Sequence, residues 1–333
     1  MREEFSIDIV MPWVNGSDPE WIKEFNKYCP ADKTIDVRNI RYRDNGLLKY
    51  WFRAIEKYAP WIRTIHFVTC GQKPEWLDLN APKLHCVNHK DYIPQEYLPV
   101  FSSHPIELMM NKIEGLSEHF IYFNDDTFLT GKVNKNYFFS GDLPRDIAIL
   151  SPITKTHIPH IVLNNVLEIN KNFNLDKSIK NNFSKWFSPK YGLLTIRTLC
   201  LLPWHYFTGF MRNHFPQPYK KQTLDEVWER CENKLTETMK SKFRNITDVN
   251  AWLFRFWHLC KGQFVPTNST KTKIMFDLSQ SMNKTRKFCK KLLQNKYKMV
   301  CINDEECTDY DEKMKIITET FEKLLPEKSS FEL

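Results

Sequence analysis

The first part of the chain alternates between short apolar stretches and amphipathic segments. The apolar stretches are rich in β-branched and aromatic residues and end at turn-forming residues, a pattern that predicts strands. Four strands are expected here, at residues 5–14, 63–70, 83–89 and 119–126. The last of them ends on Asn124, Asp125 and Asp126, so two adjacent carboxylates follow an apolar run.

Helices are predicted between these strands. Residues 46–62 carry apolar side chains at helical spacing, with Asp44 or Asn45 as the cap and Pro60 closing the helix. Residues 104–116 form a second predicted helix. Strands that alternate with helices favour an α/β fold, with a mostly parallel sheet and helices on both of its faces.

The second half of the chain is richer in helical patterns. Four helices are expected there, at residues 160–173, 222–243, 247–262 and 311–325. Thr223 and Glu226 form a capping box, Thr247 or Asp248 caps the next helix, and Gly262 stops it. A single late strand is expected at residues 297–304, and we predict that it returns to the sheet.

This change of character divides the chain into two predicted units. The candidate boundary between these two units lies within residues 140–150. We expect an α/β half at residues 1–145 and a helix-rich half at residues 146–333 that completes the same site. A chain of 333 residues is long enough for one large domain or two of ordinary size.

Composition narrows the class of protein. No apolar stretch is long enough to span a membrane, so we expect a cytosolic chain, or a fragment cut from a longer one. Nine scattered cysteines without a CxxC pair make a disulfide framework or a structural zinc site unexpected. The net charge of +8 suits anionic partners.

Polar residues follow three of the four predicted strands. They are Trp13, Asn15, Gly16, Ser17 and Asp18 after the first, Thr69, Gly71 and Gln72 after the second, and Asn124, Asp125 and Asp126 after the fourth. In open parallel sheets, ligands bind beyond the carboxyl ends of the strands. Paired carboxylates at such an edge suit a hard divalent cation such as Mg²⁺, or Mn²⁺, which bridges to substrate phosphates.

The same polar residues also have purely structural interpretations. Asn124, Asp125 and Asp126 are ordinary turn residues, and the residues after the first strand are equally compatible with a tight loop. Arg43, Asp44 and Asn45 are compatible with a helix cap beside a solvated arginine. His214 is a lone histidine in a proline-flanked loop, Arg244 precedes a helix start where a cation is unfavourable, and Asp304 ends a second apolar run in Asn-Asp.

Several stretches together resemble the Stealth family. In chain order they are IDIVMPWVNGSDPEW, RYRDNGLLKYWFRAIEKYAPWIRTIHFVTCGQKPEWLDL, FIYFNDDTFL, NHFPQPYKKQTLDEVWE, SKFRNITDVNAWLFRFW and CINDEE, and they span most of residues 6–310. This family comprises sugar-1-phosphate transferases, including bacterial capsular and cell-wall polysaccharide phosphotransferases and the animal N-acetylglucosamine-1-phosphotransferase. The compact length resembles the bacterial branch.

The resemblance implies a glycosyltransferase-A-like sheet and a UDP-sugar donor. The reaction it implies moves a sugar-1-phosphate to a hydroxyl of an oligosaccharide or lipid-linked glycan, releases UMP and creates a phosphodiester. Residues 1–145 would then bind the nucleotide sugar and residues 146–333 the acceptor. Two alternatives remain, namely a metal-dependent glycosyltransferase that releases UDP, and a non-catalytic polyanion-binding module. No nucleic-acid-binding motif is present, so nucleic acid is not an expected partner.

The resemblance implies a role for each residue of this sequence that matches a family motif. Substrate binding is implied for Trp13, Asn15, Gly16, Asp18, Arg43, Asp44 and Asn45, metal binding for Asp125 and Asp126, and catalysis for His214, Arg244, Asp125 and Asp304. A histidine often follows the first in this block, but Gln217 stands there, so His214 is the candidate base. Arg244 would hold the β-phosphate, and Asp304 would orient His214 or add a ligand.

Residues 283–298 form a basic segment with seven lysines and arginines and no acid. Phe288, Leu292, Leu293 and Tyr297 are expected on one helical face. The segment is either a solvated helix or one that docks on a membrane surface or a polyanion. The second interpretation predicts a cytoplasmic protein at the inner face of the bacterial cell membrane.

Overall fold

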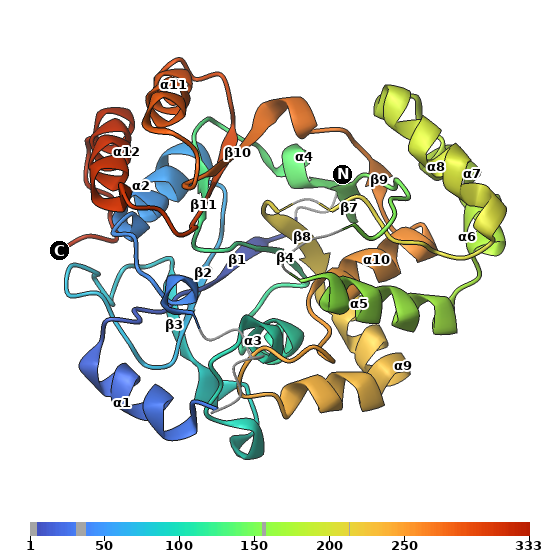
Figure 1. Ribbon diagram of the computed structural model, residues 1–333, viewed down its shortest axis with the longest axis horizontal. Coiled ribbons are helices and arrows are strands. Elements are labelled where there is room, and N and C mark those ends of the chain that lie inside the picture. The colour runs from blue at the N-terminus through green and yellow to red at the C-terminus, as the bar shows by residue number, and fades with distance from the viewer. Residues whose placement is uncertain (1–4, 31–37, 155–157, 213) are drawn as a thin grey trace.

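The structure is a computed structural model that describes residues 5–30, 38–154, 158–212 and 214–333. Its centre is a five-stranded sheet (Figure 1). The strand order is β3 (Leu84–Asn88), β2 (Ile65–Thr69), β1 (Ile7–Pro12), β4 (His119–Tyr122) and β8 (Gln217–Lys220). The first four strands are parallel and β8 is antiparallel to β4, which confirms the predicted α/β fold with a mostly parallel sheet.

Two smaller sheets complete the described strands. One has the order β10 (Lys273–Asp277), β11 (Met299–Asn303) and β5 (Thr127–Leu129), and the other has the order β6 (Phe139–Ser140), β7 (Leu143–Asp146) and β9 (Val265–Pro266). The late strand predicted at residues 297–304 is β11. It does not return to the central sheet, because β5 leaves the end of β4 and offers its own edge for pairing. The expectation of a single late strand is also wrong, since β8, β9 and β10 lie in the second half as well.

The central strands lie between two apolar cores. Ile7, Ile9 and Met11 of β1 face the first core, and Val10 faces the second. The first core is covered by α2 (Leu48–Tyr58), α11 (Met282–Leu293) and α12 (Tyr310–Leu324), and the second by α3 (Ser103–Leu108), α5 (Pro159–Asn172), α9 (Lys221–Met239) and α10 (Trp252–Lys261). A sheet covered on both faces needs nearly continuous apolar strands, which explains the sequence of β1.

Two helices begin where the capping patterns do not predict. The helix α9 starts at Lys221 directly after β8, so Thr223 lies within its first turn. The side chain that accepts from an N–H of this turn, the N–H of Gln222, is that of Glu118. The helix α10 starts at Trp252, because the carboxylate of Asp248 accepts from the backbone N–H of Asn245 and contacts a ring nitrogen of His104. Gly262 ends α10 at a φ of 69°, as predicted.

The remaining helices are short. They are α1 (Pro19–Tyr28), α4 (Lys135–Phe138), α6 (Leu175–Asn181), α7 (Phe183–Trp186) and α8 (Thr195–Leu201). The helix predicted at residues 104–116 is divided into α3 and a 3₁₀ turn at Met110–Lys112. The helices α6, α7 and α8 lie along one outer edge of the molecule, at the right of Figure 1.

Within the basic segment 283–298, residues 283–293 belong to α11 and residues 294–298 follow that helix. Phe288 and Leu292 are buried in the first core, while Leu293 is 44% exposed. The predicted apolar face is therefore used within the protein, and the exposed surface of α11 is the charged one. Within the described residues, no helix is both long enough and apolar enough to cross a membrane.

Candidate active site

A cavity of about 450 Å³ lies at the carboxyl ends of β1, β4 and β11. Segments from both ends of the chain line it, so the structure brings together residues that are far apart in the sequence. The predicted site residues in its lining are Trp13, Arg43, Asp44, Asn45, Asp125, Asp126, His214, Arg244 and Asp304. The remaining predicted residues, Asn15, Gly16 and Asp18, lie outside the lining.

The acidic pair lies in the turn between β4 and β5. Both the backbone N–H and the hydroxyl of Thr127 donate to the carbonyl of Asn124, which closes this turn. The N–H of Ile302 in β11 donates to the carbonyl of Asp126 at 2.8 Å. The segment is therefore a turn and a cavity wall at the same time, so the two interpretations of the sequence do not exclude each other.

Asp125 carries the most perturbed carboxyl group of the site. Burial, together with the negative charges of Asp126 and Asp44, raises the pKa of Asp125 to about 7. Three carboxylates thus repel one another across the cavity. Such an arrangement is stabilised when a proton or a cation neutralises part of the charge.

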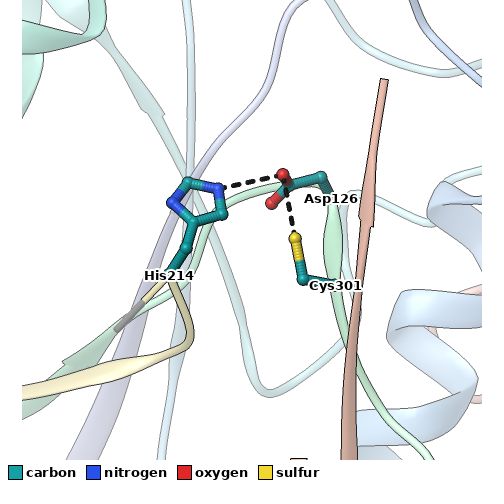
Figure 2. A group of neighbouring side chains, drawn as sticks. All are labelled: Asp126, His214 and Cys301. Atoms are coloured by element: carbon teal, nitrogen blue, oxygen red, sulfur yellow. Dashed lines mark hydrogen bonds and ion pairs between the residues drawn. The ribbon is translucent and has the colours of Figure 1, made fainter. Parts of the chain in front are cut away.

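His214 contacts the second member of the acidic pair. Its Nε2 lies 3.0 Å from Oδ2 of Asp126, and Figure 2 shows the other ring nitrogen pointing away from that carboxylate. Burial lowers the pKa of His214, but the charge and hydrogen bond of Asp126 outweigh burial and raise the pKa above its ordinary value. The imidazole is 40% exposed in its side chain, so it remains within reach of a substrate in the cavity.

Two arginines bring positive charge to the same cavity. The Nε of Arg43 lies 3.5 Å from Oδ2 of Asp304, and its guanidinium stacks over the ring of Tyr310 at 4.1 Å. Arg244 is close enough to His214 for its charge to oppose protonation of the imidazole. The carboxylate that contacts His214 is therefore that of Asp126, whereas Asp304 accompanies Arg43.

The three residues outside the lining hold the first loop in place. The Nε2 of Gln72 donates to the carbonyl of Asn15, and the Oε1 of Gln72 accepts from the N–H of Asn15, both at 2.9 Å. Asp18 caps α1 through the N–H groups of Glu20 and Trp21. The contact of Asn15, Gly16 and Asp18 with a donor stays a prediction.

Gly16 is required by a close approach of two loops. Its N–H donates to the carbonyl of Tyr42 at 2.7 Å, and a Cβ on Gly16 would lie 2.5 Å from that oxygen. Real Cβ atoms do not come this close, so a larger residue would push the two loops apart. Tyr42 directly precedes Arg43, so Gly16 sets the position of the cavity wall.

The carboxylate oxygens that lack a hydrogen-bond partner indicate whether the site suits a metal ion. Oδ1 of Asp126 and both carboxylate oxygens of Asp304 are buried without a hydrogen-bond partner among the described residues, although Oδ2 of Asp304 forms the ion pair with Arg43. Buried polar atoms normally have a partner, and oxygen ligands are those that Mg²⁺ and Mn²⁺ prefer. The residues present therefore fit a hard divalent cation.

A second donor set overlaps the first. Asp126, His214 and Cys301 present ligand atoms within 4.8 Å of one another (Figure 2). Burial and the nearby acids raise the pKa of the Cys301 thiol well above its usual value, and the thiol donates to Asp126 at 3.4 Å. A thiol held in this form is a poor metal ligand, which favours the carboxylate oxygens.

Sequence reasoning missed two residues of this region. Glu107 lines the cavity, and its carboxylate accepts from the hydroxyl of Tyr122 at 3.2 Å and from the N–H of Ala251 at 3.0 Å. A glutamate inside the apolar helix α3 is the signal that would have found it, because buried acids need such partners. Cys301 carries no comparable signal, since a cysteine in an apolar strand is ordinary.

Three conserved regions of the Stealth proteins match the chain. Conserved region 1 matches residues 5–29, conserved region 2 matches residues 41–146, and conserved region 4 matches residues 290–333. These regions include Trp13, the acidic pair and Asp304. His214 and Arg244 lie between the second and third of the matched regions.

Full-length relatives extend this match over the whole chain. The chain is 42% identical to the capsular polysaccharide phosphotransferase WcwK of Streptococcus pneumoniae over 100% of this chain and 99% of the relative. It is 40% identical to the receptor polysaccharide phosphotransferase WefC of Streptococcus gordonii, over 98% and 99%. It is 37% identical to the exopolysaccharide phosphotransferase cps2G of Lactiplantibacillus plantarum, over 98% and 96%.

This chain belongs to the Stealth family. Among solved structures it is similar to the apo bifunctional glycosyltransferase WbbM, at 11% identity and a TM-score of 0.36, over 97% of this chain and 52% of that one. It is also similar to the glycosyltransferase GlyE of Streptococcus pneumoniae TIGR4, at 10% identity and a TM-score of 0.26, over 93% and 84%. Both structural similarities are distant.

Proposed function

We propose that this protein transfers a sugar-1-phosphate from a UDP-sugar to a hydroxyl of a growing capsular or cell-surface polysaccharide. The products are a phosphodiester and UMP. The contact of His214 with Asp126 carries this proposal, because it puts a proton acceptor beside a carboxylate-rich cavity that also holds two arginines. The full-length identity to named polysaccharide phosphotransferases supports the choice of reaction.

His214 is the group that we assign to remove the proton of the attacking hydroxyl. One of its nitrogens is held by Asp126, so the ring has a fixed orientation and its Nδ1 remains to receive the proton. The base must be neutral before it acts. Because Asp126 raises the pKa of His214, we expect the reaction to speed up as the pH rises through a value above 6.5.

Arg244 and Arg43 are the groups that we assign to the phosphates of the donor. Negative charge spreads over the phosphoryl oxygens during in-line displacement, and guanidinium groups stabilise it by bidentate hydrogen bonds. Arg244 lies near His214 and would hold the reacting β-phosphate. Arg43 is fixed by Asp304 and Tyr310, so its position is set before the donor binds.

The cation that we propose is Mg²⁺ or Mn²⁺, held by Asp125 and Asp126. A divalent ion there would neutralise charge on the pyrophosphate of the donor. The raised pKa of Asp125 and the unpartnered Oδ1 of Asp126 support this assignment. Asp304 lines the same cavity, and neither of its carboxylate oxygens accepts a hydrogen bond from a described residue, although Oδ2 forms an ion pair with Arg43.

Trp13, Asp44 and Asn45 form the wall that we assign to the nucleotide sugar. Asn45 accepts from the N–H of Leu47 and Asp44 accepts from the N–H of Gly46, so both side chains shape the loop before α2. The Nε1 of Trp13 is buried without a partner among the described residues, although it lines the cavity. A polar group of the donor would satisfy this N–H.

The reaction can be tested with a panel of UDP-sugars, Mg²⁺ and short capsule-type oligosaccharides. We expect a new phosphodiester resonance in the ³¹P NMR spectrum, with UMP released in equal amount. Release of UDP without a diester would show a glycosyltransferase instead. Metal-dependent binding of a UDP-sugar with no product on any acceptor would favour a non-catalytic binding protein.

A further inference from the structure

A cluster of large apolar side chains is exposed along the outer edge of the molecule. We call it the α7–α8 patch, and its members are Phe183, Leu193, Ile196, Leu199, Trp204 and Tyr206, each between 51% and 84% exposed. They belong to α7, α8 and the turns that follow each of these helices, at the right-hand edge of Figure 1. Single exposed apolar residues are ordinary, but several within one short segment mark an interaction surface.

The helix α8 buries a polar side chain and exposes apolar ones, which is the reverse of an ordinary surface helix. Its buried residue is Thr198, whose hydroxyl accepts from the N–H of Leu150 at 3.1 Å. Ile196 and Leu199 face solvent instead. A surface helix normally turns such side chains toward the core, so the sequence of α8 is arranged for contact with something outside the chain.

The segment that carries the patch is rich in positive charge, although Asp176 pairs with His205, which lies between Trp204 and Tyr206 in the chain. No acidic residue occurs between Asp176 and Asp225, whereas Lys177, Lys180, Lys185, Lys190 and Arg197 lie within the first part of that interval. Lys185 and Lys190 donate to backbone carbonyls, of Gly262 and Pro266. In the part of the chain that the structure describes, these lysines and Arg197 have no carboxylate partner, so their charge remains available.

We propose that the α7–α8 patch docks on the surface of a membrane that contains anionic lipids. Tryptophan, tyrosine, leucine and isoleucine beside lysine and arginine are the composition of segments that lie in the bilayer interface. A protein partner would explain the apolar groups equally well. The acid-free interval selects a continuous anionic surface, because each basic residue near such a surface adds attraction.

This docking site differs from the basic helix α11. Phe288 and Leu292 of α11 are buried, so Leu293 is the large apolar side chain that α11 exposes beside its lysines. The α7–α8 patch offers several such side chains in one place. The proposal stands on exposure and charge alone and does not rest on the proposed reaction, although docking would bring the enzyme to a lipid-linked acceptor.

Vesicle flotation of the full chain tests the proposal. The wild type should float with vesicles that contain phosphatidylglycerol, and much less with pure phosphatidylcholine. The double variant Ile196→Ser/Leu199→Ser should bind anionic vesicles at least about tenfold more weakly, because two apolar side chains are lost from the interface. Leu79→Ser, at an exposed leucine elsewhere, should bind like the wild type.

Two further measurements keep the outcome clear. If the double variant does not fold, as judged by circular dichroism, Trp204→Ser replaces it, because this tryptophan lies outside α8 and is 60% exposed. Turnover of a water-soluble acceptor should be unchanged in the variants. Equal flotation of wild type and variants would overturn the proposal. So would a wild type that ignores vesicles but sediments as a dimer, which the double variant converts to a monomer.

Discussion

Nε2 of His214 lies 3.0 Å from Oδ2 of Asp126, although 88 positions separate the two residues. The register of the central sheet explains the contact. The strand β8 runs antiparallel to β4 and pairs Gln217 with Tyr122, so the residues that precede β8 meet the turn that follows β4. The pairing of these two strands thus places the imidazole of His214 beside the acidic turn, and this contact is the centre of the proposed site.

Replacing His214 by glutamine should remove most of the activity. A positioned general base contributes about 10²- to 10⁴-fold to rate, so kcat should fall within that range while KM for the donor changes little. His205→Gln is the matched control, because His205 is also paired with an aspartate but is 69% exposed in its side chain and lies away from the cavity. Substantial turnover by His214→Gln would remove the base assignment.

The pKa of His214 should fall when Asp126 is replaced by asparagine. The carboxylate stabilises the imidazolium and thereby raises this pKa, so its loss leaves the charge of Glu107, which raises the pKa, against burial and Arg244, which lower it. The measurement is the NMR titration of the imidazole in metal-free protein, with the resonance assigned by its absence in His214→Gln. The wild-type value should lie above 6.5 and the variant value below the wild-type value. An unchanged titration would mean that the contact does not persist in solution.

Much of this arrangement could be predicted from the sequence. The apolar runs of β1, β2 and β4 and the turn residues after them place Trp13 and the acidic pair at one edge of the sheet. The Asn-Asp ending of β11 places Asp304 there as well. These signals are local, because a buried strand followed by polar residues has the same sequence pattern whichever strands it pairs with.

What depends on pairing between distant strands was not predictable. The position of His214 follows from the register of β8 with β4, and a segment as short as Gln217–Lys220 has no clear strand pattern. The pairing of β11 with β5 was missed for the same reason. The capping box at Thr223 failed because β8 runs directly into α9, which leaves no turn for a cap.

Replacing Asp125 by asparagine should weaken the binding of a divalent cation. The substitution removes the carboxyl group whose pKa is raised by burial and by the neighbouring acids, so less charge remains for a cation to neutralise. We expect the dissociation constant for Mn²⁺, measured by electron paramagnetic resonance, to rise at least about tenfold. Asp311→Asn, in the exposed first turn of α12, is the control. Equal Mn²⁺ affinity in both variants would argue against a cation at the acidic pair.

Replacing Gly16 by alanine should disturb the cavity wall without unfolding the protein. The added Cβ would lie 2.5 Å from the carbonyl oxygen of Tyr42, so the loop that carries Arg43 and Asp44 must move. We expect a loss of about 1–3 kcal/mol in the free energy of unfolding and a higher KM for the donor. The control is Gly115→Ala, where a φ of 72° strains the backbone but no atom of the described residues lies within 4 Å of the added Cβ. A KM effect confined to Gly16→Ala would separate the loop contact from general strain.

A buried charge network away from the acidic turn should make the stability of the protein depend on pH. Asp146 receives two hydrogen bonds of 2.8 Å from Arg255, and its Oδ2 lies 3.0 Å from Nε2 of His258. Burial opposes the charge of Asp146, but these partners hold its pKa well below the usual range. Burial also lowers the pKa of His258, despite the opposing effect of Asp146.

Both groups therefore bind fewer protons in the folded state than in the unfolded chain, so stability falls as the pH falls. The loss due to His258 begins near its unfolded pKa of about 6.5, and the loss due to Asp146 begins near about 4. Asp146→Asn should lower the free energy of unfolding at pH 7 by about 3–5 kcal/mol, because Arg255 is left buried without its partner. In urea titrations the difference between wild type and variant should shrink as the pH is lowered toward the folded pKa of Asp146. A difference that stays constant from pH 7 into strong acid would show that the carboxylate of Asp146 does not carry this stability.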